Sequence, residues 1–276
     1  MIVFFGTPLL DIIAKVDHDF LKKYNLKPDN AIRATPELEG VFKDIFNFNP
    51  ILQPGGSVTN TARVFQWASQ KSYPMFFIGP IGDDYLGKII ENTFIEEGIN
   101  SHIVEVKNEK TGTCAVLLTD ENRSMVTHLG ASKFFSIDNL DENLWKKISE
   151  AKYLYLSEYF SFAKISNIET TNAKDLLIKA NELFKNKPLR ILIMTRGRKS
   201  LLIQSENRLE EFDAPQLEEE KVVDTNGAGD AFVGGFLSQF VKNNGLLECV
   251  RCGIWAAQEI IQNHGCKFNS KLVYNN

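Results

Sequence analysis

The 276-residue sequence contains no apolar stretch that approaches about 18 residues, so we expect no transmembrane helix. Its first residues lack a charged n-region and a small-residue cleavage site, so we expect no signal peptide. The net charge is −4 without an evident basic patch, which argues against nucleic acid as a partner. These absences predict a cytoplasmic protein, with the nucleus left open, that has neither membrane nor nucleic acid as a partner.

Cysteine is scarce, with four residues in the whole chain. Cys249 and Cys252 form a C-x-x-C, but no second C-x-x-C or C-x-x-H pair is present to complete a zinc tetrahedron. The segment from Leu246 to Ile261 has helical periodicity. We therefore interpret the cysteines as free thiols in a reducing cytosol rather than as metal ligands or redox centres.

Two widespread phosphate-binding patterns are also missing. The sequence has no G-x-x-x-x-G-K-[ST], which excludes a Walker-A loop. Its glycines at 227, 229 and 234 do not fit G-x-G-x-x-G, because the third comes two residues late for a dinucleotide fold. Any phosphate site must therefore be built in another way.

The most informative segment present runs from Asp224 to Phe236. It places Asp230 directly after the glycine-rich turn Gly227-Ala228-Gly229, and the apolar run Ala231 to Val241 then predicts a buried helix. A helix N-terminus binds anions, and a carboxylate beside it can take the proton of an attacking alcohol. The alternative is that Asp230 is only a helix N-cap in a common turn, and the segment alone leaves both interpretations open.

Short apolar runs alternate with helical segments along the chain, which predicts an α/β fold with a mostly parallel sheet and helices on both faces. A β-hairpin is expected at 113–119 and 124–129, because both flank the turn residues at 120–123. Together with residues 31–34 it predicts a small strand lid. Strands are predicted at 2–5, 75–78, 151–156 and 189–194, and helices at 59–69, 84–97 and 173–184.

Ordered motifs along nearly the whole chain resemble the ribokinase-like carbohydrate kinases of the PfkB family and, more narrowly, its adenosine kinase branch. The motifs are Pro8-Leu-Leu-Asp11, Gly55-Gly-Ser-Val-Thr-Asn60, Ile78-Gly-Pro-Ile-Gly-Asp83 with Leu86-Gly87, Thr111-Gly-Thr-Cys-Ala115, Asn122-Arg-Ser124, Thr195-Arg-Gly-Arg198, Asp224 to Phe236 and Gly265-Cys-Lys-Phe268. The resemblance implies a doubly wound α/β fold in a single kinase domain over 1–276, with lid strands from about 9–35 and 111–131. It implies a monomer that transfers the γ-phosphoryl group of ATP to the 5′-hydroxyl of adenosine, with Mg²⁺.

The resemblance also assigns the acceptor side of the site. It makes Asp230 the catalytic base and Gly227, Ala228 and Gly229 the anion hole. The ribose hydroxyls would be bound by Asp11, Gly56 and Asn60, and Gly55 and Ser57 would also belong to the substrate-binding residues. A carboxylate such as Asp11 can accept from both ribose hydroxyls, and glycines let backbone approach the sugar closely. The simpler interpretations are a surface strand-end carboxylate for Asp11, a structural turn at Gly55-Gly56 and a merely polar helix residue for Asn60.

The base and nucleotide sides are assigned in the same way. By the resemblance, Tyr159 or Phe160 stacks on adenine, and Cys114, Met125 and Thr127 line the lid side, although each could instead be plain core packing. Arg123 would either reach phosphate or be a solvated turn residue. The ATP-binding residues implied are Thr195, Gly197, Asn226, Ala256 and Ala257.

The match departs from the family between Phe162 and Leu189, where the chain is too short for the further strands and helices expected. The family's Asn-x-x-Glu motif, which orders Mg²⁺, has only Asn167-Ile-Glu169 in its place, so the metal ligands stay unassigned. A sheet without central strands would leave backbone groups unpaired, which favours the hypothesis that residues are missing here. Thr7 and Ala31 replace an Asn and a purine-contacting Gln, which weakens the assignment of base specificity. The alternatives are a kinase of another nucleoside or sugar, and a non-catalytic nucleoside-binding relative.

Overall fold

The computed structural model divides into two compact units. One comprises Met1–Ser157 with Val222–Asn276, and the other comprises Glu158–Lys221. The residues that the structure describes are 1–120, 122–135, 140–157, 172–175, 177–178, 191–205 and 208–275.

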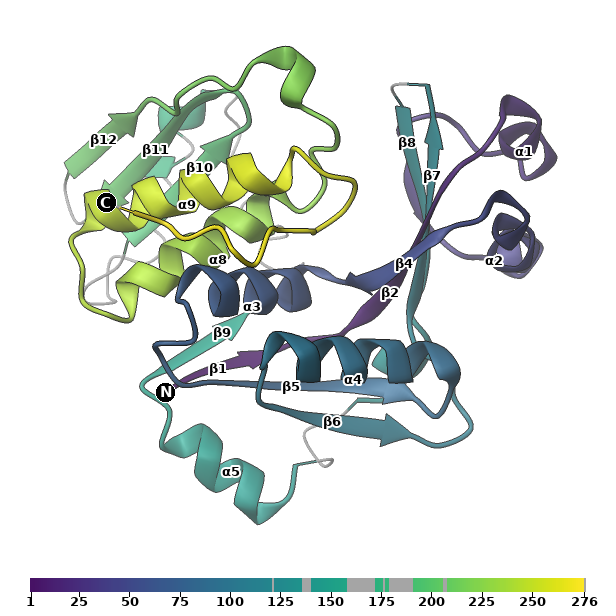
Figure 1. Ribbon diagram of the computed structural model, residues 1–276, viewed down its shortest axis with the longest axis horizontal. Helices are drawn as coiled ribbons and strands as arrows, with labels where there is room; N and C mark the ends of the chain where they lie inside the picture. Colours follow the sequence, from purple (N-terminus) through teal and green to yellow (C-terminus); the bar gives the residue numbers. More distant parts are fainter. Residues whose placement is uncertain are drawn as a thin grey trace. The chain divides into compact units, whose positions relative to one another are not determined.

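The first unit contains a four-stranded parallel sheet with the strand order β6-β5-β1-β9 (Figure 1). The strands predicted at 2–5, 75–78 and 151–156 all belong to it, and β6 is an additional strand. Strand β5 is buried along its whole length, as is typical of a parallel strand covered on both faces. The strands are β1 (Ile2–Phe5), β5 (Met75–Gly82), β6 (Ser101–Val106) and β9 (Tyr153–Leu156).

Successive residues of these strands point into two different hydrophobic cores. Phe4 and Phe77 pack with α3 (Ser57–Ala68) and α4 (Tyr85–Glu97) on one face. Val3 and Phe76 pack with α5 (Glu142–Ser149) on the other face. The doubly wound arrangement that the sequence predicted is therefore confirmed.

A second, five-stranded sheet of the same unit has the order β3-β8-β7-β2-β4. The predicted hairpin is confirmed, because β7 and β8 pair antiparallel, and β2 joins β7 in parallel. Strand β4, which lies outside the ranges predicted for the lid, pairs antiparallel with β2. The strands are β2 (Leu9–Lys15), β3 (Ala31–Arg33), β4 (Ile51–Gly55), β7 (Thr113–Thr119) and β8 (Asn122–His128).

Short helices cover one face of this second sheet (Figure 1). Phe20 and Val41 pack there against Ala115, Leu117 and Val126. The helical segments are α1 (His18–Lys23), η1 (Pro36–Leu38), α2 (Glu39–Asp44) and η2 (Ile45–Phe48), with η3 (Gly130–Lys133) following β8. The side chains that alternate with this core point to the opposite face, which carries the candidate site.

Helices α3, α8 (Ala228–Phe240) and α9 (Leu246–Ile260) pack closely together. A methyl group at Gly234 of α8 would lie 2.8 Å from the backbone oxygen of Thr61 in α3, so only glycine permits this approach. Helix α3 is buried on nearly every side, in agreement with its position between the sheet and α8. Of the described helices, none has the length and apolar content to cross a bilayer.

The second unit contains an antiparallel sheet with the order β10-β11-β12. The strand predicted at 189–194 is β10, whereas β11 and β12 are additional. Gly197 lies in the turn between β10 and β11, with a left-handed φ of 62°. The bounds are β10 (Ile191–Arg196), β11 (Lys199–Ser205), β12 (Arg208–Phe212) and a short helix η6 (Glu219–Lys221).

Candidate active site

Asp230 lies in the first turn of α8, and the local sequence explains its position. Gly227 at the helix N-cap has a left-handed φ of 75°, which glycine adopts without strain. Asp224 closes the preceding turn by accepting a hydrogen bond from the Asn226 N–H at 2.8 Å. Among the described residues, a methyl group at Gly229 would meet no atom within 4 Å. The first turn of α8, which the sequence assigned to an anion hole, therefore has open space beside Gly229.

Two side chains at the start of α3 hold the Asp230 carboxylate. The Ser57 hydroxyl donates to Oδ1 at 2.7 Å, and the Asn60 amide donates to Oδ2 at 3.0 Å. Burial raises the pKa of Asp230, and these two hydrogen bonds oppose the increase by favouring the ionised form. The other amide atom of Asn60, Oδ1, is buried without a partner in the part of the chain that the structure describes. A buried amide oxygen normally has a hydrogen-bond partner, so this atom is an exception.

Asp11 lies in β2 and is 6% exposed, so it is not the surface carboxylate of the simpler interpretation. Burial raises the pKa of Asp11 to about 7, the positive charge of Arg63 opposes the increase, and the negative charge of Asp230 adds to it. The two carboxyl groups predicted for the site are therefore near enough to interact. A buried carboxyl group with a pKa shifted toward neutrality is typical of a functional site.

The Gly55-Gly56 pair is required by close contacts around Asp11 and the start of α3. A methyl group at Gly55 would lie 2.3 Å from the Asp11 carboxyl group. Gly56 has a φ of 91°, and a methyl group there would lie 2.8 Å from the Thr7 backbone oxygen. The turn therefore has a structural role, and it also places Asp11 beside the first turn of α3.

The residues predicted to line the base lie on one face of the second sheet. Asp11 pairs with Cys114 across β2 and β7, and Cys114 pairs with Thr127 across β7 and β8. Met125 lies opposite Val116, two residues further along each strand, so it points to the same face. Burial raises the pKa of Cys114 to about 12, so its thiol stays neutral. The structure thus brings Cys114, Thr127 and Met125 to the face that carries Asp11.

Arg123 at the start of β8 forms an ion pair with Asp224, with Nη1 donating to Oδ1 at 2.9 Å. Asp224 is 8% exposed and also accepts a hydrogen bond from the Gly265 N–H at 3.0 Å. The interpretation of Arg123 as a solvated turn residue is therefore wrong. Sequence alone could not reveal this pair, because its members are 101 positions apart.

The predicted ATP-binding residues fall in different parts of the molecule. Asn226 lies in the turn before α8, and Ala256 on α9 is buried in a core that includes Ala231 of α8. Ala257, its neighbour on α9, is partly exposed. In the second unit, Thr195 lies near the end of β10 and Gly197 lies in the β10–β11 turn. Tyr159 and Phe160, and the Asn167-Ile-Glu169 segment, lie outside the described residues.

Sequence reasoning missed Arg63, which lies on α3 one turn after Asn60. It is 6% exposed and forms an ion pair with Glu97 of α4. A single arginine in a helical segment is normally interpreted as solvent-facing, so the sequence carried no signal for this burial.

The four cysteines are all free thiols, as predicted, and all are buried. Cys249 and Cys252 are among the buried residues of α9.

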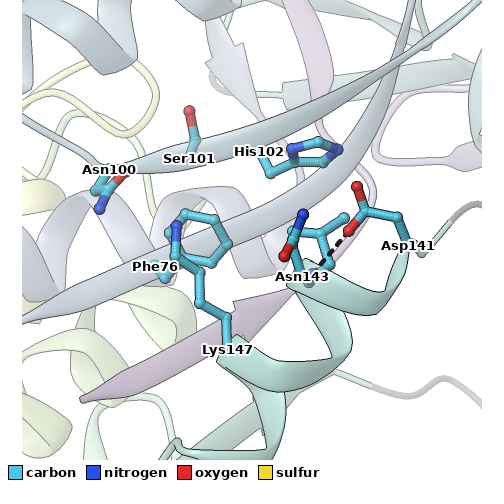
Figure 2. A pocket seen from close by; sticks show the side chains of 8 residues that line it. Phe76, Asn100, Ser101, His102, Asp141, Asn143 and Lys147 are labelled. Carbon is cyan, nitrogen blue, oxygen red and sulfur yellow. Dashed lines mark hydrogen bonds between the residues drawn. The ribbon is translucent and has the colours of Figure 1, made fainter.

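A cavity of about 210 Å³ lies between β6 and α5, on the sheet face opposite α3 (Figure 2). Lys147 lies over the Phe76 ring, with Nζ 4.0 Å from the ring centroid, and Asp141 caps α5 by accepting from the Leu144 N–H. The cavity is separate from Asp230, because Ser57 and Asn60, which contact the Asp230 carboxylate, lie on α3 and α3 packs on the other face of the sheet. The lining residues are Phe76, Asn100, Ser101, His102, Asp141, Asn143, Leu144 and Lys147.

The family described as pfkB family carbohydrate kinase matches residues 47–173 and 161–272. The chain is 29% identical to adenosine kinase 2 of Arabidopsis thaliana, over 98% of this chain and 96% of that protein. It is 27% identical to the adenosine kinase of Saccharomyces cerevisiae, over 99% and 98% of the two chains. The Arabidopsis alignment extends over 332 positions, more than the 276 residues here, so that relative has residues without a counterpart in this chain.

Solved structures give the same grouping. The adenosine kinase of Anopheles gambiae, solved in complex with P1,P4-di(adenosine-5) tetraphosphate, is 30% identical with a TM-score of 0.81, over 96% of each chain. The adenosine kinase of Trypanosoma brucei brucei is 28% identical with a TM-score of 0.85, over 95% of this chain and 98% of that one. With the site geometry and the family match, these likenesses show that the chain belongs to the pfkB family of carbohydrate kinases.

Proposed function

We propose that the protein is an adenosine kinase, which transfers the γ-phosphoryl group of ATP to the 5′-hydroxyl of adenosine to give AMP and ADP. The observation that carries the proposal is the placement of Asp230. Its carboxylate lies in the first turn of α8, next to the open space beside Gly229, and is held by Ser57 and Asn60 of α3. Phosphoryl transfer to an alcohol needs such a pairing of a proton acceptor with an anion site.

The chemistry assigned to this chain's residues begins with the acceptor. Asp11 accepts hydrogen bonds from the ribose hydroxyls, each of which contributes about 1.5–3 kcal/mol when the acceptor is charged. These contacts hold the 5′-hydroxyl near Asp230, which removes its proton as the bond to phosphorus forms. We assign the N–H groups of Gly227, Ala228 and Gly229 to stabilise the charge on the phosphoryl oxygens, for which the Ala228 N–H must exchange its 3.3 Å hydrogen bond to the Thr225 backbone oxygen.

Adenosine is supported as the acceptor by the names of the relatives and by the second sheet. The curated relatives from Arabidopsis and yeast are adenosine kinases that match nearly the full chain. The sheet face beside Asp11 presents the neutral thiol of Cys114 with Met125, which suits a flat, largely apolar base better than a free sugar. We assign the five-stranded sheet as the lid of a single kinase domain.

Magnesium belongs to this proposal through its complex with ATP, where it neutralises phosphate charge when bound. In the parts of the chain that the structure describes, no group of three or more His, Cys, Asp or Glu side chains is placed to hold a metal ion. No residue of this chain is therefore assigned as a magnesium ligand, and none of the steps above depends on one.

We also propose that the enzyme acts as a monomer in the cytoplasm. The buried free thiols of Cys114, Cys249, Cys252 and Cys266 fit a reducing compartment. Sedimentation of the purified protein tests the monomer, and imaging of the tagged protein in its own cells tests the compartment.

The function is tested by measuring ATP consumption with Mg²⁺ and adenosine, inosine, ribose or fructose as the acceptor. We expect adenosine to have the highest kcat/KM and AMP to be its product. A clear preference for another acceptor would assign a different kinase of the same family. Binding of adenosine without any turnover would make the protein a non-catalytic relative and would overturn the proposal.

A further inference from the structure

Arg63 is a buried cation that the catalytic steps above do not use. Its Nε and Nη2 atoms both donate to the Glu97 carboxylate, at 2.9 and 2.6 Å. Its Nη1 atom donates to two backbone oxygens, those of Pro54 at 3.3 Å and Cys266 at 3.0 Å. The guanidinium group also lies 5.5 Å from the centroid of the Phe268 ring. Every arm of the side chain is therefore fixed by a partner.

The two backbone oxygens belong to segments that contact the carboxylates of the site. Pro54 precedes Gly55, which lies directly against the Asp11 carboxyl group. Cys266 follows Gly265, whose N–H donates to Asp224. Asp224 in turn holds the turn that leads into α8. One guanidinium nitrogen thus ties together the two backbone segments that contact Asp11 and Asp224.

We propose that Arg63 is a positioning residue for phosphoryl transfer, which holds the 54–56 and 265–266 segments together around the nucleoside-binding carboxylate Asp11. This inference rests on the proposed function, because it assigns Asp11 to the ribose. The positive charge of Arg63 also affects the pKa of the Asp11 carboxyl group. The charged groups that shift this pKa are Arg63 from α3, Arg123 from β8, Asp230 from α8 and Asp224 from the preceding turn.

Burial raises the pKa of Asp11, and of these charges Arg63 lowers that pKa most strongly. Loss of its charge raises the pKa of Asp11 above its value of about 7 and leaves less carboxylate at neutral pH. The ionised form accepts both ribose hydroxyls, so kcat/KM for adenosine should increase with pH as Asp11 loses its proton. Arg63 should therefore determine the pH at which this increase occurs.

A purely structural role is the alternative, since breaking a buried ion pair destabilises a protein wherever it lies. Glu97→Gln is the matched control, because it breaks the same ion pair but leaves the positive charge of Arg63 in place. Glu97 is not among the groups with the largest effects on the pKa of Asp11. Arg63→Lys keeps the charge and loses the forked contacts, so it separates the electrostatic contribution from the geometric one.

The experiment measures kcat/KM for adenosine between pH 5.5 and 9 for the wild type and the three variants. For Arg63→Gln we expect the rise of kcat/KM to move to higher pH, with a loss of about tenfold or more at pH 7. Arg63→Lys should restore the wild-type pH dependence with a smaller loss at every pH. Glu97→Gln should lower the melting temperature without moving the pH dependence. An unmoved profile in Arg63→Gln, or an equal shift in Glu97→Gln, overturns the inference.

Two further experiments cover the cases in which Arg63→Gln does not fold or the wild type does not phosphorylate adenosine. If Arg63→Gln does not fold, the double variant Arg63→Gln/Glu97→Gln removes both charges and must show the same displaced profile. If the wild type does not phosphorylate adenosine, the proposed function fails, and Arg63 is tested without turnover. Carbon-13 NMR of the aspartate carboxyl groups, with Asp11→Asn to identify the signal, then measures the pKa of Asp11 in each variant. An unchanged pKa in Arg63→Gln contradicts the inference independently of activity.

Discussion

The α8 end of the site and the β2 end hold their carboxylates in different ways. At the α8 end, Ser57 and Asn60 donate hydrogen bonds to both oxygens of Asp230. At the β2 end, the pKa of Asp11 is set by burial and then by the charges of Arg63 and Asp230, without a hydrogen-bond contribution from the described residues. Asp230 is thus oriented by the fold itself, whereas Asp11 keeps its acceptor capacity for a ligand.

This difference matches the different tasks that we propose for the two groups. A general base must point along one direction when the alcohol approaches, so its orientation is best fixed in advance. A group that recognises a diol must keep its lone pairs free until the ligand brings the donors. Substitutions at the α8 end should therefore lower kcat, and substitutions at the β2 end should weaken nucleoside binding.

The largest effect is expected from Asp230→Asn, which keeps the shape of the side chain but removes the proton acceptor. Turnover should fall by about 10²–10⁴-fold, the usual contribution of a general base. Adenosine affinity, measured by calorimetry, should stay close to that of the wild type. Turnover within a factor of a few of the wild type would remove Asp230 from its catalytic role.

Asp11→Asn should produce the opposite pattern. Replacing a charged acceptor by a neutral one weakens two hydrogen bonds of about 1.5–3 kcal/mol each, so kcat/KM for adenosine should fall by about 10–10²-fold. Most of that loss should appear in KM and in the calorimetric Kd, with a smaller change in kcat at saturation. A variant whose kcat falls while its affinity is kept would contradict the division between the two ends.

The same substitution tests the pH dependence of stability. The folded state raises the pKa of Asp11 to about 7, so it binds that proton more tightly than the unfolded chain does. The resulting stabilisation is fully present at acid pH and is lost as the pH rises toward 7. Relative to Asp11→Asn, the wild type should therefore lose stability on the order of a few kcal/mol between about pH 4 and pH 7. Urea unfolding at several pH values measures it, and parallel pH curves for both proteins would show that Asp11 is not titrating there.

Gly55→Ala should disturb the β2 end through geometry alone. The new methyl group would lie 2.3 Å from the Asp11 carboxyl group, so Asp11 must move. We expect a stability loss of about 1–3 kcal/mol, as for other overpacked sites, together with a raised KM for adenosine. Gly245→Ala is the matched control, because a methyl group there meets no described atom within 4 Å and φ is −61°. Equal effects of the two substitutions would show that the contact with Asp11 is not the cause.

The parts of this fold that depend on local pattern could be predicted from the sequence. The short apolar strands, the β7–β8 hairpin and the caps of α4 follow from runs, turns and single residues such as Asp84 and Gly98. Strand β4 could not be predicted, because Gln-Pro-Gly-Gly carries no strand pattern and the pairing with β2 is a tertiary event. Strands β11 and β12 carry no alternation of apolar and polar residues, and their antiparallel pairing is also a tertiary event.

In the candidate site, too, contiguous residues could be predicted and contacts between distant residues could not. Asp230 and its glycine turn are contiguous in sequence, so their chemistry was visible before the fold was known. The contacts of Asp230 with Ser57 and Asn60 join residues at least 170 positions apart. Arg63 is held by three partners from different segments, Glu97, Pro54 and Cys266. Only the packed structure reveals such contacts, since an isolated helix would expose the same side chains to water.

The smallest effect, and the finest test of the contrast, is expected from Ser57→Ala. It removes one of the two hydrogen bonds that fix Asp230, so it should cost about 0.5–1.5 kcal/mol in transition-state stabilisation, which is less than about fifteenfold in kcat. The lost hydrogen bond also favoured the ionised form, so the pKa of Asp230 and the acid limb of the kcat profile should both move upward. Thr61→Val on the same helix is the control, because the Thr61 hydroxyl bonds the Ser57 backbone oxygen and not the carboxylate. A change in adenosine Kd with kcat unaltered would mean that Ser57 binds the substrate instead of orienting Asp230. The assignment of turnover to the α8 end and of nucleoside binding to the β2 end would then be wrong.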